Sequence, residues 1–398
     1  MLIDGVRNAR VSGVDGLVDI AFDGSLIQSI VPAGAGSRSG VDVGGRAVIP
    51  GLVDAHVHLD KAYQLDALAA TAAPLGTLAE AIDATAAVHR RLRSADLVAA
   101  AERLLGRMVR HGTTAARVHV ELSATAGLDH LRWQVTLARA WHDRITLQFV
   151  AFPQHGLFQD PGIPELLEEA LGAGCEVVGG CSYADDDALR HTAHVIDLAA
   201  RYDRLLDLHI DFACDPTVHD LDGVVDGVRD RGWVPGRVVL GHVTSLSAME
   251  LGDAARRTTA LAAAGIGVVS LPATDMFLTG AITPLGALAE AGVTVAVGTN
   301  NTANAFTPYG DGSLLQTAWL AGLVGRFPPG RGHQSLLDMV TTSPARLLGL
   351  EGYGLAPGCR ADLVVIDSDR PTDAVTVPAE VVITCHGGRL SHGAELAR

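Results

Sequence analysis

The sequence predicts an α/β fold class, in which a (β/α)8 TIM-like barrel is joined to a small β-sandwich domain formed from both chain termini. Three observations predict it. Between about residues 50 and 350, short β-branched apolar runs alternate with longer Ala- and Leu-rich segments, which is the pattern of repeated βα units around a parallel sheet. Eight such runs can be counted, and eight units favour closure into a barrel. Both ends of the chain instead carry short alternating strands.

The eight apolar runs are the expected barrel strands, and the barrel is expected to span residues 50–351. Strands that helices cover on both faces read as short, nearly continuous apolar runs. We place these strands near residues 53–59, 114–121, 145–152, 176–181, 205–211, 237–242, 266–271 and 293–299.

The terminal segments, residues 1–49 and 352–398, have a different pattern. Their short strands are broken by Gly and Asp, which is typical of antiparallel sheet. Neither segment has enough strands to bury a core alone. We therefore expect the two segments to combine into one small β-sandwich.

Composition bounds the class of protein. Hydrophobic residues make up 48% and charged residues 19% of the 398 residues, which excludes a disordered chain. No apolar run reaches the roughly 20 residues that span a bilayer. The N-terminus shows no basic segment followed by an apolar stretch, so we expect a cytoplasmic protein. The net charge of −15 argues against nucleic acid or an anionic membrane as partner and favours a small neutral or weakly basic substrate.

Cysteine and lysine usage adds two points. The five cysteines form no close-spaced pairs, so neither a disulfide framework nor a cysteine zinc site is expected. The basic residues are arginine throughout except for one lysine, Lys61. Because a planar guanidinium does not replace a compact ammonium, a specific role for Lys61 is favoured over the alternative of a lone surface lysine.

Histidines stand at the ends of three expected strands. The first ends in His56-Val-His58, the fifth in His209 and the sixth in His242. Barrel enzymes assemble their sites at the carboxyl ends of the strands, and alternation places His56 and His58 on one face. Any one histidine alone would more often be a core or surface residue, but four at strand ends favour a metal site. Imidazoles suit zinc or iron(II), and a metal with an open position lowers the pKa of bound water to about 7.

Segments along most of the chain, in matching order, carry a resemblance to a known family. They are PGLVDAHVHLDKAY (50–63), VAFPQ (150–154), LDLHIDFACDP (206–216), GHVTSLS (241–247), SLPATDMFLTG (270–280), NAFTPYGDGSLLQ (304–316), TTSPARLLGL (341–350) and GLAPGCRADLVVIDSD (354–369). Together they resemble the amidohydrolase superfamily, and within it the cytosine-deaminase-like branch that includes N-isopropylammelide isopropylaminohydrolase.

The resemblance implies a metal centre and a set of site residues. One divalent metal ion per chain, zinc, iron or manganese, would be bound by His56, His58 and His209, with His242 as a proton shuttle or electrophile. Lys61 matches a site residue of the isopropylammelide enzyme. Further candidates are Gln154 and Asn301 as substrate contacts, and Asp211 and Asp275 as catalytic groups. The resemblance also makes a homo-oligomer possible.

The chain departs from the branch at several of these positions. Asn300 stands where members usually place an aspartate at the end of the eighth strand; its amide can ligate weakly but cannot act as a base. Phe212 stands where cytosine deaminase has an acid/base glutamate, and Cys181-Ser-Tyr183 replaces a histidine-containing segment. No lysine lies near the fourth strand, so the carbamylated-lysine bridge of dinuclear relatives cannot form there. These differences favour a single metal, or none, and a substrate other than cytosine.

Two interpretations follow. In the first, the chain is a metal-dependent hydrolase of non-peptide C–N bonds in a small cyclic amidine, amide or N-substituted heterocycle, attacking through metal-bound hydroxide. His242, Asp211, Asp275 or Lys61 would then move the protons, and either ammonia or a substituted amine would leave. In the second, the loss of carboxylates leaves a catalytically impaired binding or partner protein. Retention of all four histidines favours the first.

Overall fold

The computed structural model describes residues 1–35, 39–71 and 75–394. Eight parallel strands form one sheet in chain order, which confirms the predicted (β/α)8 arrangement. They are β6 (Leu52–Val57), β7 (Thr113–Leu122), β8 (Thr146–Pro153), β9 (Val177–Cys181), β10 (Leu205–Ile210), β11 (Val238–His242), β12 (Gly267–Ser270) and β13 (Val295–Val297). The first and last strands meet just beyond their ends, where Asn300 N donates to His56 O at 2.8 Å and His58 N donates to Asn300 O at 2.9 Å. The barrel therefore closes beside the predicted site.

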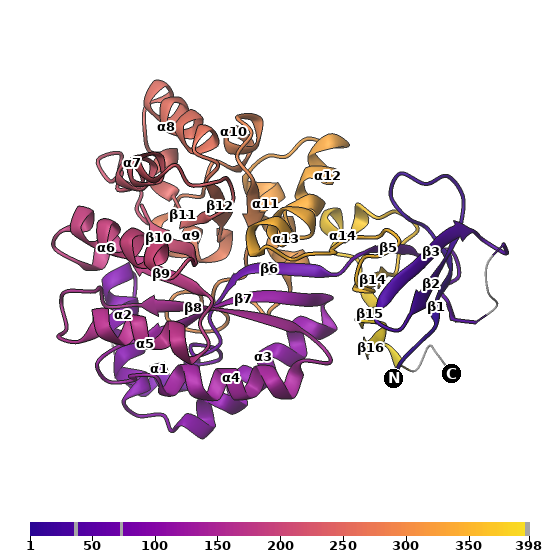
Figure 1. Ribbon diagram of the computed structural model, residues 1–398, viewed down its shortest axis with the longest axis horizontal. Helices are drawn as coiled ribbons and strands as arrows, with labels where there is room; N and C mark the ends of the chain where they lie inside the picture. Colours follow the sequence, from indigo (N-terminus) through magenta and orange to yellow (C-terminus); the bar gives the residue numbers. More distant parts are fainter. Residues whose placement is uncertain (36–38, 72–74, 395–398) are drawn as a thin grey trace.

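Helices surround the barrel on its outside (Figure 1). Several begin at residues that suit a helix N-terminus: Thr77 and Glu80 form a capping box, and Asp187 and Ser313 cap their helices through side-chain oxygens. The helices are α1 (Leu65–Ala69), α2 (Leu78–His89), α3 (Ser94–Arg110), α4 (Asp129–Trp141), α5 (Ile163–Ala173), α6 (Ala188–Arg201), α7 (Leu221–Arg231), α8 (Leu251–Ala263), α9 (Pro272–Thr279), α10 (Leu285–Glu290), α11 (Leu314–Val324), α12 (Arg331–Asp338), α13 (Thr342–Leu348) and α14 (Asp373–Thr376), with short 3-10 turns at Ser182–Ala184 and Thr244–Ser247. No helix in the parts of the chain that the structure describes is long and apolar enough to cross a membrane.

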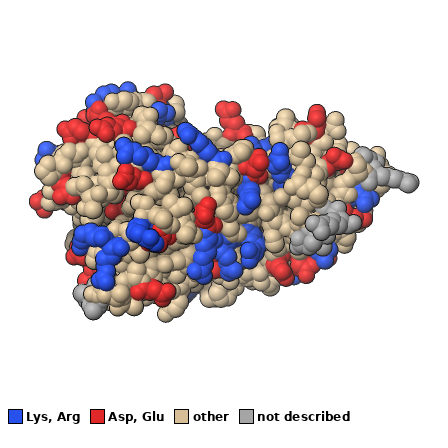
Figure 2. Space-filling model, turned by 90° about the horizontal axis from the view of Figure 1, so that it is seen from below, with Lys and Arg blue, Asp and Glu red and all other residues tan. Residues whose placement is uncertain are grey.

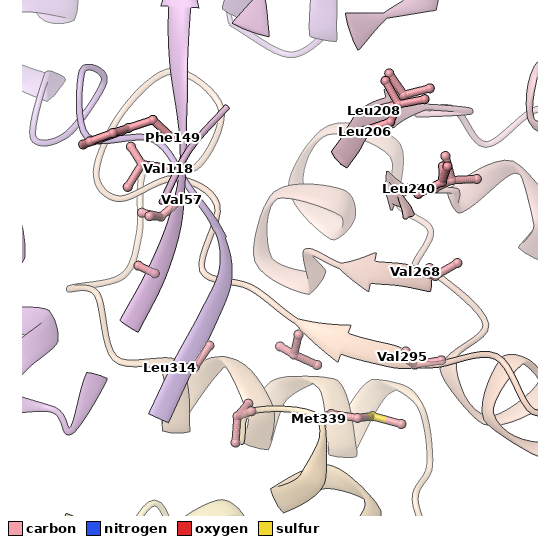
Figure 3. Packing of buried hydrophobic residues seen from close by; sticks show 14 of the residues in the cluster. Val57, Val118, Phe149, Leu206, Leu208, Leu240, Val268, Val295, Leu314 and Met339 are labelled. Carbon is pink, nitrogen blue, oxygen red and sulfur yellow. The ribbon is translucent and has the colours of Figure 1, made fainter. Parts of the chain in front are cut away.

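The main core lies between the barrel strands and the helices. Figure 3 shows Val118 beside Phe149 on neighbouring strands, and Leu206 and Leu208 on β10. Alternation turns the intervening residues of each strand toward the barrel axis. At the end of the barrel near α13, apolar inward residues such as Val269 belong to one cluster with Leu347, and the buried Arg117 donates to Leu347 O at 2.8 Å. Near the carboxyl ends of the strands the inward residues include the predicted histidine ligands, which places the chemistry there.

The two termini fold together at one side of the barrel, as predicted (Figure 1). One sheet has the order β3-β2-β1-β4 and the other β16-β15-β14-β5. The strands are β1 (Gly5–Ala9), β2 (Val18–Asp23), β3 (Leu26–Pro32), β4 (Val41–Asp42), β5 (Ala47–Pro50), β14 (Leu363–Ile366), β15 (Val381–His386) and β16 (Arg389–His392). Ile20 and Leu363 are among the buried residues of this second core. The residues at which the chain passes between the two domains stay a prediction.

Acidic and basic side chains are mixed over the face seen in Figure 2 and do not form separate acidic and basic patches there. Many of them pair locally, as in the Arg93–Asp96 and Arg256–Asp253 ion pairs. Such exposed pairs contribute little to stability but favour solubility.

Candidate active site

Three predicted metal ligands converge at the carboxyl ends of β6 and β10. His56, His58 and His209 are all buried, with exposed fractions of 0%, 3% and 4%. The Nε2 atom of His209 lies 3.1 Å from that of His56 and 3.3 Å from that of His58. Two nitrogens bound to one tetrahedral metal at about 2.0–2.1 Å would lie roughly 3.3 Å apart. The spacing of these imidazoles therefore fits a tetrahedral divalent ion.

The surroundings keep these imidazoles in the form that binds a metal. Burial lowers the pKa of all three well below the usual histidine value, so the rings are neutral. His58 Nδ1 lies 3.2 Å from the main-chain oxygen of His119, and donation there leaves the Nε2 lone pair free. Gly241 makes room for the His56 ring, because a Cβ atom there would lie 3.3 Å from it.

Asn300 lies next to this cluster. Its main chain closes the barrel between His56 and His58 in a left-handed conformation, with φ of 59°. Its side-chain Oδ1 is buried and has no hydrogen-bond partner among the described residues. A buried, unpaired oxygen is costly unless it has a ligand. The donor set therefore fits a metal with three imidazoles and one weak oxygen ligand.

His242 and Asp275 form a buried pair beside this cluster, with the His242 ring centroid 5.2 Å from that of His209. His242 Nδ1 lies 2.7 Å from Asp275 Oδ1, and Asp275 Oδ2 accepts a hydrogen bond from Leu271 N at 3.1 Å. Burial raises the pKa of Asp275, while the contact with His242 opposes the rise. The Phe212 ring stacks on His242, with centroids 3.7 Å apart. The imidazole is thus held from two sides, with Nδ1 engaged and Nε2 left for a substrate.

Lys61 is buried, with 1% of its surface exposed, so the alternative of a surface lysine is wrong. Its Nζ donates to Gln154 Oε1 and lies 3.7 Å from Glu121 Oε2. The ammonium also lies 5.3 Å from the ring centroids of Phe152 and Phe306. Lys61, a predicted catalytic residue, and Gln154, a predicted substrate contact, therefore touch each other directly.

These groups enclose one small cavity of about 10 Å³, enough for about one water molecule. Its lining comprises His58, Lys61, Leu78, Gln154, Tyr183, His209, Phe212, His242, Thr274, Asn300, Asn301 and Phe306. Leu78, Thr274 and Phe306 were not expected from the sequence as site residues, although Thr274 and Phe306 lie in segments that carry the family resemblance. A planar substrate would meet aromatic side chains from several separate segments.

Asp211 and Asp275, two predicted catalytic residues, do not line this cavity, but Asp275 contacts the lining residue His242 whereas Asp211 hydrogen-bonds elsewhere. The Asp211 Oδ1 accepts a hydrogen bond from Asp220 N at 2.7 Å and its Oδ2 one from Leu221 N at 3.4 Å. Burial and the nearby Asp220 raise the pKa of Asp211 to about 7. The carboxylate fixes the start of α7, and the catalytic role of Asp211 stays a prediction.

A second buried polar group lies deeper in the barrel. His119 stacks on His56 with centroids 3.7 Å apart, and its Nε2 is 3.6 Å from Asp207 Oδ1. His56, His119 and Asp207 offer ligand atoms within 4.8 Å of one another. However, the fully buried Arg117 pairs with Asp207 at 2.8 Å, and a guanidinium there opposes a second cation. We read this group as support for His56.

A (β/α)8 barrel with histidines able to bind a divalent metal at its carboxyl end defines the class of metal-dependent barrel hydrolases. The chain belongs to the amidohydrolase family, which matches residues 91–392. It is therefore a hydrolase that acts on C–N bonds other than peptide bonds.

Individual relatives cover nearly the whole chain. It is 26% identical over 391 residues to the N-isopropylammelide isopropyl amidohydrolase of Pseudomonas sp., covering 97% of this chain and 96% of that one. It is 30% identical over 389 residues to a pterin deaminase of Rhizobium rhizogenes, covering 94% and 87%. The crystal structure of 5-methylcytosine deaminase from Klebsiella pneumoniae superposes with a TM-score of 0.89 at 26% identity, covering 97% of each chain.

Proposed function

We propose that this protein hydrolyses an exocyclic C–N bond of a small amino-substituted heterocycle and releases ammonia. The observation that carries the proposal is the tetrahedral spacing of the His56, His58 and His209 nitrogens beside a cavity that His242 and Lys61 share. The relatives named above act by name on N-isopropylammelide, a pterin and 5-methylcytosine, which supports a heterocyclic substrate. Removal of a substituted amine is the alternative within the same class.

The three histidines would hold one divalent ion, zinc, iron or manganese, and the Asn300 Oδ1 would be a weak further donor that leaves a position open for water. Such an ion supplies a nucleophile at neutral pH by lowering the pKa of water to about 7. Asn300 is neutral, so it cannot take a proton from water as an aspartate would. The proton must therefore go to another side chain of the cavity.

His242 is the group best placed for this proton. Asp275 accepts from His242 Nδ1 at 2.7 Å, which leaves Nε2 unprotonated and ready to receive a proton. The carboxylate then stabilises the imidazolium that forms, and the same nitrogen returns the proton to the leaving amine. The stacked Phe212 keeps the ring in place during both transfers.

Lys61, Gln154 and Asn301 would bind the heterocycle. An ammonium donates only, whereas a primary amide both donates and accepts, so the Lys61–Gln154 pair matches a ring edge with an oxo group next to a ring nitrogen. Asn301 Oδ1 already accepts from Asn304 Nδ2 at 2.7 Å, which fixes its orientation at the cavity wall. Loss of ammonia is preferred because the pterin and 5-methylcytosine relatives are deaminases by name.

The experiment is a metal analysis followed by a substrate screen. Purified protein should contain roughly stoichiometric zinc, iron or manganese, and a panel of aminopyrimidines, aminotriazines and pterins should be tested for ammonia release. The same panel with N-alkyl substituents separates deamination from removal of a substituted amine. A protein without metal and without turnover would support the binding-protein interpretation. Cytoplasmic location and homo-oligomeric assembly stay predictions.

A further inference from the structure

A second polar cavity, of about 370 Å³, lies behind Lys61. Its walls come from α2, the start of α3, the end of β7, α4 and the loop after β8. The lining includes His89, Glu121, Ser123, His130 and His155. None of these residues lines the cavity that holds the metal-binding histidines.

The Lys61–Glu121 ion pair forms the wall between the two cavities. Lys61 lines only the first cavity and Glu121 only the second, and their charged atoms lie 3.7 Å apart. Both side chains are almost fully buried, at 1% and 4% exposed. On its other side the Lys61 ammonium meets Gln154, a substrate-binding candidate. The pair thus connects the substrate cavity with groups that do not line it.

The surroundings of Glu121 keep it ionised. Its Oε2 lies 3.6 Å from His89 Nδ1 and its Oε1 lies 4.0 Å from His155 Nε2. Its main-chain N–H donates to Asp60 Oδ2 at 2.9 Å, and that carboxylate faces His130 Nδ1 at 3.5 Å.

Burial alone would raise the pKa of Glu121, but His89, Lys61 and His130 together hold it below its usual value. Glu121 is therefore a fixed anion behind the lysine and not a group that exchanges protons near neutral pH.

A buried ammonium needs such an anion. Gln154 is neutral, and the aromatic rings of Phe152 and Phe306 cannot replace a carboxylate. Without a counter-charge, burial favours loss of the proton from a lysine or its withdrawal toward solvent. The charge and position of Lys61 in the substrate cavity thus depend on a residue outside that cavity.

We propose that Glu121 is the positioning residue for Lys61, holding the ammonium charged and aimed at the substrate from the second cavity, with His89 orienting the carboxylate. This inference rests on the proposed function, in which Lys61 binds the heterocycle. It adds a residue that touches neither substrate nor metal. His89 and Glu121 together form a support that the sequence pattern around the metal site does not reveal.

The test exploits the fact that Lys61 is the only lysine of the chain. Protein labelled with 13Cε,15Nζ-lysine gives a single lysine side-chain signal, whose position reports whether the amine is protonated. In Glu121→Gln, which keeps shape and removes charge, this signal should titrate at lower pH than in wild type. Glu121→Asp should restore most of the wild-type behaviour, and Ser123→Ala, on the same cavity, is the matched control. An unchanged titration in Glu121→Gln would overturn the proposal whether or not a substrate has been found.

Activity is the second readout. With a substrate that wild type turns over, Glu121→Gln should lower kcat/KM by about tenfold or more with metal content unchanged, and should add no further loss in a Lys61→Met background. Additive losses, or loss of metal, would show that Glu121 acts in another way. Failure of the proposed function would instead appear as no turnover by the metal-loaded wild type, with the lysine signal still responding to Glu121→Gln.

Discussion

His242 Nδ1 and Asp275 Oδ1 lie 2.7 Å apart, although the two residues belong to different elements, the end of β11 and the first turn of α9. Asp275 is itself fixed by the N–H of Leu271. The main chain turns at His242, with φ of 73°, so the imidazole leaves the strand toward the cavity. The end of β11 and the first turn of α9 together therefore fix the tautomer of His242.

Asp275→Asn should therefore lower kcat by about 10²-fold or more and leave KM within a few-fold, because proton transfer by a positioned base contributes 10²–10⁴-fold. The amide keeps the shape but cannot stabilise the imidazolium. Steady-state kinetics against pH will measure the effect, with the exposed Asp253→Asn as control. A wild-type kcat in Asp275→Asn would remove His242 from the proton pathway.

His58→Ala should abolish both metal binding and activity. Removing one of three imidazoles leaves two protein nitrogens, too few for a stable tetrahedral site. Elemental analysis of the purified variant will give the metal content, and His142→Ala, at an exposed position, is the matched control. Stoichiometric metal retained by His58→Ala would mean that the ion binds elsewhere.

Lys61→Arg should lower kcat/KM by about tenfold or more and leave the metal in place. The planar guanidinium needs more space than the site between Gln154, Phe152 and Phe306 offers, and it cannot place one compact charge at the same point. Turnover and metal content measured on the same preparation will separate the two effects. Full turnover by Lys61→Arg would contradict the claim that the site needs a compact ammonium at this position.

The sequence predicted the barrel, the β-sandwich formed from both termini and the histidine cluster, because each of them has a local sequence pattern. Apolar runs mark buried strands, and His-x-His at a strand end places two side chains on one face. Asp211 does not line the cavity, and the reason is physical. It follows His209 by two residues, yet its main chain adopts φ of 51° and its side chain turns to the N–H groups of Asp220 and Leu221. Spacing alone does not reveal such a turn.

The buried residues that support the site from β7 could not be predicted from sequence spacing either. Arg117, His119 and Glu121 alternate along β7 and point to one face, but the sequence offers no sign of what lies opposite them. Arg117 meets Asp207 from β10, and Glu121 meets Lys61 and His89 from elements that the barrel topology brings together. Such pairings depend on closure of the barrel, which no single segment encodes.

Asp185→Asn should destabilise the fold by about 1–3 kcal/mol near neutral pH, because one carboxylate accepts from Leu157 N, Phe158 N and His191 Nδ1. Burial would raise the pKa of Asp185, but these hydrogen bonds lower it below 3.8. A lowered pKa means that the stabilisation is complete above about pH 4 and is lost as the pH falls through the folded-state value. Thermal unfolding at pH 7 and pH 3 should show the gap between wild type and variant shrinking in acid. A constant gap would contradict this reading.

Asn300→Asp should make stability depend more strongly on metal. The Oδ1 of Asn300 is buried and unpaired beside three neutral imidazoles, so a carboxylate there lacks a counter-charge when no ion is present. An uncompensated buried charge costs several kcal/mol. After chelation the Asn300→Asp variant should therefore melt at a lower temperature than wild type. After zinc is added the variant should melt at a higher temperature than wild type, because an anionic ligand binds the ion more tightly.

The comparison needs melting curves of both proteins with chelator and with zinc, alongside their metal content. If zinc shifts both proteins equally, residue 300 is not a ligand, and the three histidines hold the metal without it. If wild type gains nothing and only the variant responds, the native asparagine has weakened the site, and the binding-protein interpretation gains support.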